Sequence, residues 1–405
     1  MVRELKHTEI GDIPADWELQ TFDETFRVLS NNTLSRENLN NRGGAVRNIH
    51  YGDILTKFPE VLDCKEEIPY VNDLSLLSSS TQLLQDGDIV IADTAEDETV
   101  GKVTEVQNLG DSKLVAGLHT IPCRVKKGDF APGWLGYYMN SNLFHNQILP
   151  YITGIKVSSI SKGAISETLI LVPPFDEQEK IVQSLNEVQL LMTAETKVVN
   201  KMKFVKNGCL SKMFPQKDAT VPEMRLPGFT DAWEQRELGT VTQEFKSGNS
   251  LKADKISESG KYPVYGGNGL RGYTSNYNHD GEFALIGRQG ALCGNMNYSI
   301  GKAYFTEHAV VVEANEKNNT RFIYYMLDTM NLGQYSDQSA QPGLAVNKLI
   351  KLENMFPRKE EQVWIGNYFQ SLDHLITLHQ RKCDKYSSIK KGMMSDLLTG
   401  KIRLV

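Results

Sequence analysis

The sequence holds few residues in patterns that support catalysis. A nucleotide hydrolase needs the segment GxxxxGK followed by Ser or Thr to cradle phosphates, and this segment is absent. The turn Gly287-Arg-Gln-Gly290 is glycine-rich but lacks the strand-then-helix context of a dinucleotide site, so we interpret it as a tight turn. His119 and His308 have no Cys or Ser nucleophile nearby in a recognisable setting, and we interpret them as satisfied core histidines.

One segment has a partial likeness to a catalytic motif. Val172-Pro-Pro-Phe175 is superficially similar to the Asn-Pro-Pro-aromatic motif of amino-methyltransferases. That motif uses its Asn or Asp to hydrogen-bond the target amine, which Val172 cannot do. A second copy of this region, described below, has Phe356-Pro357 at the same place. We therefore do not expect this segment to be catalytic.

Polar residues on turn-rich segments recur in both halves of the chain. Asn and Arg side chains can pair bidentately with the edges of adenine and guanine, although each residue alone is equally well an ordinary surface residue. The candidate DNA contacts are Arg47, Asn48, His50, Lys156 and Ser158 in the first half, and Asn268, Arg271, Arg288, Gln289, Asn347 and Lys348 in the second.

The charge balance limits how such contacts could work. The net charge is -6, with the acidic excess in the first 172 residues and a basic excess at the C-terminal end. A lone nucleic-acid binder is usually strongly basic. The charge balance therefore counts against a protein that binds DNA unaided, and it leaves room for one that reads DNA while partners supply most phosphate contacts.

The element that organises the chain is a repeated helix. The stretch from Pro173 to Phe214 matches the stretch from Pro357 when it is moved forward by 184 residues, and Gly208 falls on Gly392. Each copy opens with proline, has acidic residues near its start and carries lysines toward its end, a pattern that favours a long helix.

Apolar residues repeat through each copy at heptad spacing, which predicts a coiled-coil seam. Glu195 and His379 break the two seams at equivalent positions. In an antiparallel arrangement the middles of the helices meet, so we expect these two side chains to lie together. The predicted helix-helix and partner interface is Ile181, Leu185, Val188, Met192, Glu195, Ile365, Phe369, Leu372, Ile376 and His379.

A globular segment precedes each long helix. Both segments begin with a similar stretch around Trp17 and Trp233, which we interpret as aromatic anchors, and both continue with short apolar strands. The chain is therefore predicted to be a tandem duplication of the α+β class, with two mixed α/β domains separated by two long helices. The predicted segments are 1–172, 173–215, 216–356 (linker and second domain) and 357–405.

The remaining features concern location and metals. Five cysteines lie far apart with no CxxC spacing, which argues against zinc and fits a reducing cytoplasm. No secretory segment follows Met1, and no apolar run approaches about 18 residues. We expect a cytoplasmic protein with no metal site.

Four segments of the sequence resemble the DNA specificity subunit of type I restriction–modification enzymes. They are Pro173 to Ile181, Pro222 to Leu238, Pro357 to Ile365 and Leu397 to Ile402, and together they cover 41 of the 405 residues. The resemblance implies two target-recognition domains held apart by two conserved antiparallel helices, in a subunit that is not itself an enzyme. No contact residue carries over from the family with confidence.

The resemblance also implies partners. Methyltransferase subunits that use S-adenosylmethionine would dock on the helices, and restriction subunits that use ATP and Mg would complete the complex, so no cofactor is expected in this chain. We predict a subunit that reads a split double-stranded DNA target and directs adenine methylation and restriction. The alternative is a coiled-coil adaptor whose globular ends bind proteins without reading DNA, and a catalytic methyltransferase is disfavoured.

Overall fold

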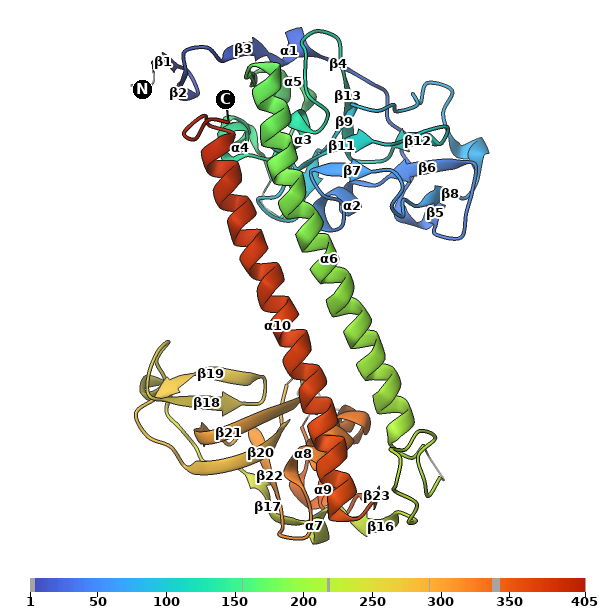
Figure 1. Cartoon of the computed structure of the whole chain (residues 1–405), viewed down its shortest axis with the longest axis vertical. Helices are drawn as coiled ribbons and strands as arrows, with labels where there is room; N and C mark the ends of the chain where they lie inside the picture. Colours follow the sequence, from blue (N-terminus) through green and yellow to red (C-terminus); the bar gives the residue numbers. More distant parts are fainter. Residues whose placement is uncertain (1–3, 155, 217–218, 291, 337–342, 405) are drawn as a thin grey trace. The chain divides into compact units, whose positions relative to one another are not determined.

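The computed structural model describes residues 4–154, 156–216, 219–290, 292–336 and 343–404. The chain divides into two compact units, one formed by Met1–Ala194 with Cys383–Val405 and the other by Glu195–Lys382. Each unit combines one globular segment with parts of the two long helices, α6 (Phe175–Met213) and α10 (Lys359–Leu397), which Figure 1 colours green and red. The domain boundaries predicted from the sequence, which divide the chain into four segments, stay a prediction.

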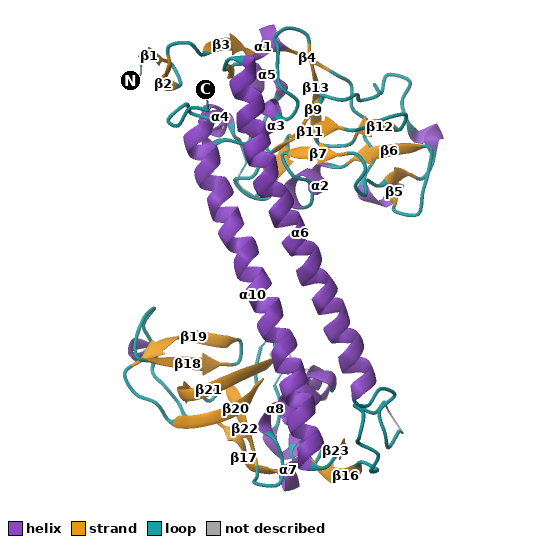
Figure 2. Ribbon diagram, viewed as in Figure 1, coloured by secondary structure: helices purple, strands orange, loops and turns teal. Residues whose placement is uncertain are grey.

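The first unit is built on a five-stranded sheet of order β4-β13-β9-β11-β7 (Figure 2). Its central strand β9 (Ile89–Ala92) is buried at every residue, as expected for an apolar strand covered on both faces. Its partners are β4 (Phe26–Val28), β13 (Thr120–Val125), β11 (Val103–Gln107) and β7 (Val61–Asp63).

A second sheet of order β12-β6-β8-β5 belongs to the same unit. Its strands are β12 (Lys113–Ala116), β6 (Val46–Ile49), β8 (Tyr70–Val71) and β5 (Leu39–Asn40). The smaller pairs are β1 (Leu5–Thr8) with β2 (Gly11–Pro14), β10 (Thr94–Ala95) with β14 (Ser158–Ser159), and β3 (Glu18–Thr21) with β15 (Leu169–Val172). The short helices are α1 (Phe22–Thr25), α2 (Tyr51–Thr56), α3 (Trp134–Tyr138), α4 (Asn142–Ile148) and α5 (Lys162–Ser166), with single 3₁₀ turns at Arg36–Asn38, Leu74–Leu76 and Leu149–Tyr151.

The second unit is built on a six-stranded sheet of order β17-β22-β20-β21-β18-β19. The strands are β17 (Thr242–Ser247), β22 (Ala309–Ala314), β20 (His279–Gly287), β21 (Met296–Phe305), β18 (Tyr262–Gly266) and β19 (Gly269–Thr274), and β16 (Glu234–Glu237) pairs separately with β23 (Glu353–Phe356). The short helices are α7 (Leu238–Val241), α8 (Thr320–Thr329) and α9 (Val346–Leu349), with 3₁₀ turns at Ala253–Lys255 and Leu332–Tyr335.

The five-stranded sheet of the first unit and the six-stranded sheet of the second share one topology, which supports the predicted duplication. In the first unit β4, β13, β9 and β11 lie side by side, each antiparallel to the next, and β7 adds in parallel. In the second unit β17, β22, β20 and β21 repeat this order, and β18 adds in parallel. The pairs β3/β15 and β16/β23 also correspond. The β12-β6-β8-β5 sheet has no counterpart among the described residues of the second unit.

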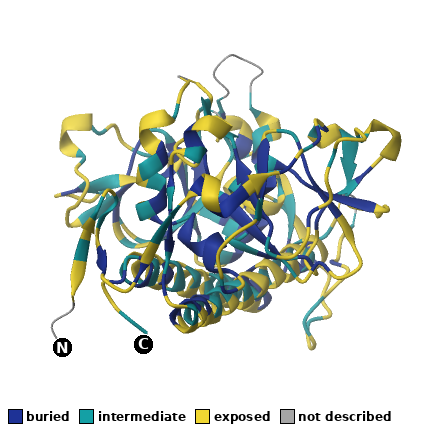
Figure 3. Ribbon diagram, turned by 90° about the horizontal axis from the view of Figure 1, so that it is seen from above, coloured by how far each residue is buried: buried dark blue, intermediate teal, exposed yellow. Residues whose placement is uncertain are grey.

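Each long helix contributes its seam residues to the core of both units. In the first unit Ile181 and Leu185 share a core cluster with Leu397. In the second unit Cys209 and Met213 of α6 share a cluster with Ile365 and Phe369 of α10. The start of one helix therefore packs with the end of the other in each unit, as the antiparallel prediction requires. Figure 3 shows buried residues concentrated in the strands and exposed residues in the loops and along the long helices.

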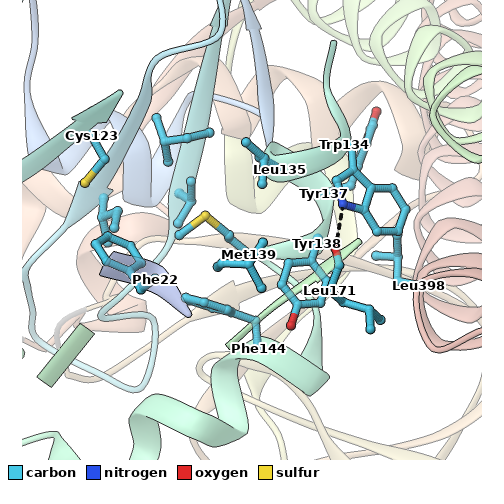
Figure 4. Close-up of a cluster of buried hydrophobic side chains, with 14 of the residues drawn as sticks. Phe22, Cys123, Trp134, Leu135, Tyr137, Tyr138, Met139, Phe144, Leu171 and Leu398 are labelled. Carbon is cyan, nitrogen blue, oxygen red and sulfur yellow. Dashed lines mark hydrogen bonds between the residues drawn. The ribbon is translucent and has the colours of Figure 1, made fainter. Parts of the chain in front are cut away.

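The tryptophan anchors predicted from the sequence are confirmed, since Trp17 and Trp233 are both buried in these clusters. Trp134 extends the first cluster, and Figure 4 shows its Nε1–H donating to the carbonyl oxygen of Leu171 at 3.1 Å. Within the part of the chain that the structure describes, none of the helices combines the length and the apolar character needed to cross a membrane.

Candidate nucleic-acid interface

In the second unit, several of the predicted contacts meet at one end of the sheet. Arg288 and Gln289 directly follow β20, and His308 directly precedes β22. The Arg288 backbone N–H donates to the His308 carbonyl oxygen at 2.9 Å, and His308 Nδ1 lies 3.0 Å from Gln289 Oε1. Arg288 Nη1 donates to Ser247 Oγ at 3.1 Å, so the guanidinium is held at the end of β17.

The hairpin β18–β19 brings Asn268 to the same end. Its turn passes so close that a Cβ added to Gly267 would lie 3.1 Å from the His308 carbonyl oxygen. Asn268 is exposed in this turn, as predicted. Arg271 is also exposed but lies on β19, not on a turn, because the turn is shorter than the sequence suggested.

The two remaining candidates of the second half lie on α9. The Leu344 backbone N–H donates to the Arg288 carbonyl oxygen at 2.9 Å, which connects the segment before α9 to the end of β20. Asn347 and Lys348 follow on this short helix with exposed side chains. The sequence therefore identified a set of residues that the fold gathers at one end of the sheet, and their contact with DNA stays a prediction.

The first unit gathers residues at the equivalent end of its sheet. Asp93 and Thr94 follow β9, and His119 precedes β13. The Asp93 backbone N–H donates to the His119 carbonyl oxygen at 3.1 Å, and Thr94 Oγ1 lies 3.2 Å from His119 Nδ1. The rings of Tyr51 and His119 contact each other edge-on at a centroid distance of 5.3 Å, and the ring of His50 lies 4.6 Å from that of Tyr51.

Two further candidates of the first half lie beside this end. Ser158 pairs with Ala95 in the ladder between β10 and β14. Lys156 is exposed just before β14. His50 is mostly buried, caps α2 by accepting the Gly52 N–H, and burial lowers the pKa of its imidazole. A direct role in contacting DNA therefore suits Lys156 and Ser158 better than His50.

The predicted turn placement of Arg47 and Asn48 is wrong. Both lie on β6, which pairs in parallel with β12, and both are buried, Asn48 completely. Asn48 Oδ1 accepts a hydrogen bond from Asn32, and Arg47 donates to the Cys64 carbonyl oxygen. Because β6 lies within the second sheet and both side chains are buried there, neither is exposed for contact with a base edge in this conformation.

The interpretation of His119 and His308 as core residues is also wrong. Their side chains are 45% and 42% exposed. Each lies in a turn at a strand start, and His119 adopts a left-handed backbone conformation with φ of 56°. The strand pattern around them is real, but the turn places the imidazoles at the surface.

The seam of the long helices follows the predicted spacing. Ile181, Leu185 and Phe369 are completely buried, and Ile365 nearly so. The remaining predicted seam residues are half-buried, namely Val188, Met192, Leu372 and Ile376. The seam is thus covered best where a globular segment also packs on it.

The predicted polar pair is present in the seam of the second unit. His379 Nδ1 is hydrogen-bonded to Glu195 Oε2, and Lys382 Nζ lies 3.3 Å from Glu195 Oε1. Both members of the pair are mostly buried, with side chains 20% and 16% exposed. The heptad breaks therefore predicted this contact correctly.

This pair should make the stability of the second unit depend on pH. The hydrogen bond from His379, followed by Lys382, holds the pKa of Glu195 below its usual range. A lowered folded-state pKa stabilises the fold above about pH 4.3, the pKa of an unfolded glutamate, and this contribution is lost as the pH falls. We expect Glu195→Gln to flatten the acid side of the stability curve, measured by chemical denaturation between pH 3 and 7. The exposed control Glu316→Gln should keep the wild-type slope, and equal slopes for all three proteins would contradict the prediction.

Sequence reasoning missed a buried ion pair that recurs in both units. Arg403 donates to both oxygens of Glu177, at 2.7 Å each, and also to Asp16. Arg225 donates to both oxygens of Glu361, at 2.7 and 2.6 Å. Each arginine is followed by a leucine that packs on the core, so the repeated Arg-Leu dipeptide was the available signal.

The comparisons with known proteins agree with this architecture. Residues 230–385 match the sequence model of the type I restriction modification DNA specificity domain. Over 145 residues the chain is 45% identical to the type I restriction enzyme EcoprrI specificity subunit of Escherichia coli, a match that spans 35% of this chain and 36% of that protein. It is 24% identical to the putative type I restriction enzyme MjaX specificity subunit of Methanocaldococcus jannaschii, over 98% of this chain and 96% of that one.

Solved structures show the same fold. The S subunit of a type I restriction-modification system from M. genitalium superposes with a TM-score of 0.67 at 17% identity, covering 98% of this chain and 99% of that chain. A chain from a study of complex assembly and conformational transition of the type I R-M system gives a TM-score of 0.53 at 15% identity, covering 96% and 99%. The resemblance noted in the sequence is confirmed.

Proposed function

We propose that this chain is the non-catalytic subunit that selects the DNA sequence in a type I restriction–modification complex. Residues 230–385 match the model of the type I DNA specificity domain, and the chain is similar along its length to a putative type I specificity subunit. The observation that carries the proposal is the duplicated sheet. Each copy ends in a cluster of polar turn residues, Asp93, Thr94 and His119 in one and Arg288, Gln289 and His308 in the other.

The duplication supports a split target. Two copies of one fold with different side chains at the same strand end suit the reading of two different half-sites. The net charge of -6 suits a chain that reads bases while partner subunits bind much of the phosphate backbone. In this proposal partner subunits carry S-adenosylmethionine, ATP and Mg, methylate adenine and cut DNA, and the complex works in the cytoplasm.

Exposed apolar side chains on the long helices support partner docking there. Leu190 and Phe204 of α6 are 69% and 79% exposed, and Trp364 of α10 is 54% exposed. Large aromatic side chains are enriched at protein interfaces, where they bury much area at low entropic cost. We assign these helix faces to the methyltransferase subunits.

Methylome sequencing of cells that carry the intact system tests the function. We expect one split adenine-methylation motif. Exchanging residues 234–356 for the same segment of a related subunit should change one half of this motif and keep the other half. The matched control exchanges residues 18–172 and should change the opposite half only.

Two outcomes would contradict the proposal. If the purified chain with matching methyltransferase subunits binds no duplex and directs no methylation, the result favours the alternative of a coiled-coil adaptor that binds proteins without reading DNA. If both halves of the motif change after one exchange, the units do not read independently.

A further inference from the structure

The backbone is arranged in the same way at the ends of the two central strands, β9 and β20, but the side chains there differ. In the first unit Ala92 pairs with Thr120, and Asp93 and His119 flank this pair. In the second unit Gly287 pairs with Ala309, and Arg288 and His308 flank it. The strand register is therefore the same at both sites.

Two backbone hydrogen bonds fix each flanking residue. Asp93 N–H donates to His119 O, and Asp93 O accepts from Ile160 N–H, at 3.1 and 2.9 Å. Arg288 N–H donates to His308 O, and Arg288 O accepts from Leu344 N–H, at 2.9 Å each. The backbone at both positions is held from both sides, which gives the precision that a reading residue needs.

The next residue in each chain segment is also held by the histidine. Thr94 Oγ1 lies 3.2 Å from His119 Nδ1, and Gln289 Oε1 lies 3.0 Å from His308 Nδ1. Thr94 pairs with Ser159, and Gln289 forms a bridge with Gly343, so the third strand segment is equivalent too. The histidine thus orients the side chain at the same place in both units.

The side chains themselves differ in hydrogen-bonding character. Asp93 and Thr94 offer a carboxylate and a hydroxyl, whereas Arg288 and Gln289 offer a guanidinium and an amide. Arginine pairs with guanine, glutamine pairs with adenine, and a carboxylate accepts from the amino group of cytosine. The same frame therefore presents two different hydrogen-bonding patterns.

We propose that the residue pair after the central strand, Asp93–Thr94 in the first unit and Arg288–Gln289 in the second, determines which bases each half of the target contains, with His119 and His308 as positioning residues. The inference rests on the proposed function and assigns its specificity to named side chains. It predicts that a change at either pair alters one half of the methylated motif.

The test uses the full chain with its methyltransferase subunits and methylome sequencing as the readout. Gln289→Ala should reduce methylation of the original motif by about 5- to 150-fold and relax the base requirement at one position of one half-site. Thr94→Val should do the same in the other half-site only. Replacing Arg288 and Gln289 together by Asp and Thr should change the bases read in the half-site that Gln289→Ala affects.

A matched control separates reading from folding. Gln243 is exposed at the other end of the same sheet, on β17, so Gln243→Ala should keep the motif and the methylation level. His308→Ala should relax the same motif position as Gln289→Ala, because it frees the Gln289 amide, and a merely structural histidine would lower methylation of all sites equally.

The outcomes distinguish the inference from the proposed function. If the wild-type chain directs a split motif and the Gln289, Thr94 and double variants all keep every base of it, the residue assignment is overturned and the function stands. If the wild-type chain directs no sequence-specific methylation, both are overturned. A base change confined to the expected half-site supports the assignment.

Discussion

Replacing Arg403 by alanine is expected to destabilise the first unit by about 3 kcal/mol. Its partner Glu177 is only 2% exposed, and the guanidinium satisfies both carboxylate oxygens. Removal of one partner of a buried ion pair leaves the other charge without compensation, which costs far more than the pair contributes. For a unit of this size the melting temperature should fall by about 6–12 °C in thermal unfolding followed by circular dichroism.

The duplicated architecture offers a matched comparison for this prediction. Arg225→Ala removes the equivalent partner of Glu361, which is also 2% exposed, and should destabilise the second unit by a similar amount. Arg358→Ala is the control, because the 75% exposed Arg358 pairs with Asp231 at the surface and should change stability by less than about 1 kcal/mol. Equal melting temperatures for Arg403→Ala and Arg358→Ala would contradict the buried ion-pair account.

Features that repeat at a fixed offset or period could be predicted from the sequence. The seam residues Ile181 and Phe369 follow a heptad pattern that only a long helix satisfies, and Glu195 and His379 interrupt it at equivalent positions. Their contact in the structure follows from that pattern and the antiparallel direction. Local periodicity was therefore enough to predict the two long helices and one polar contact between them.

Features that depend on pairing between distant segments could not be predicted in this way. Arg47 and Asn48 are buried because β6 pairs in parallel with β12, and nothing near residue 47 signals that pairing. Arg403 meets Glu177 across 226 residues of sequence. His119 is exposed because it lies in a left-handed turn before β13, which begins only at Thr120. In each case a non-local contact or a turn conformation decided exposure, which short patterns do not encode.

Replacing Trp134 by alanine is expected to destabilise the first unit by about 4 kcal/mol. The indole is completely buried, stacks on Tyr138 at a centroid distance of 6.1 Å, and meets the edge of Trp17 at 6.3 Å (Figure 4 shows its hydrogen bond to Leu171). The substitution removes this packing, leaves a cavity and deletes the Nε1–H donor. The melting temperature should fall by about 8–16 °C.

An exposed tryptophan on α10, Trp364, supplies the control. Trp364 is 54% exposed on α10, so Trp364→Ala should change the free energy of unfolding by no more than about 0.5 kcal/mol. If the helix face that carries Trp364 binds methyltransferase subunits, the same variant should weaken assembly with them, measured by titration with the purified subunits.

The stability of Trp134→Phe should lie between those of Trp134→Ala and wild type, because this variant keeps an aromatic ring but loses the hydrogen bond to Leu171. A loss of stability that is the same for Trp134→Ala and Trp364→Ala would show that burial in the first core does not determine the contribution of this side chain.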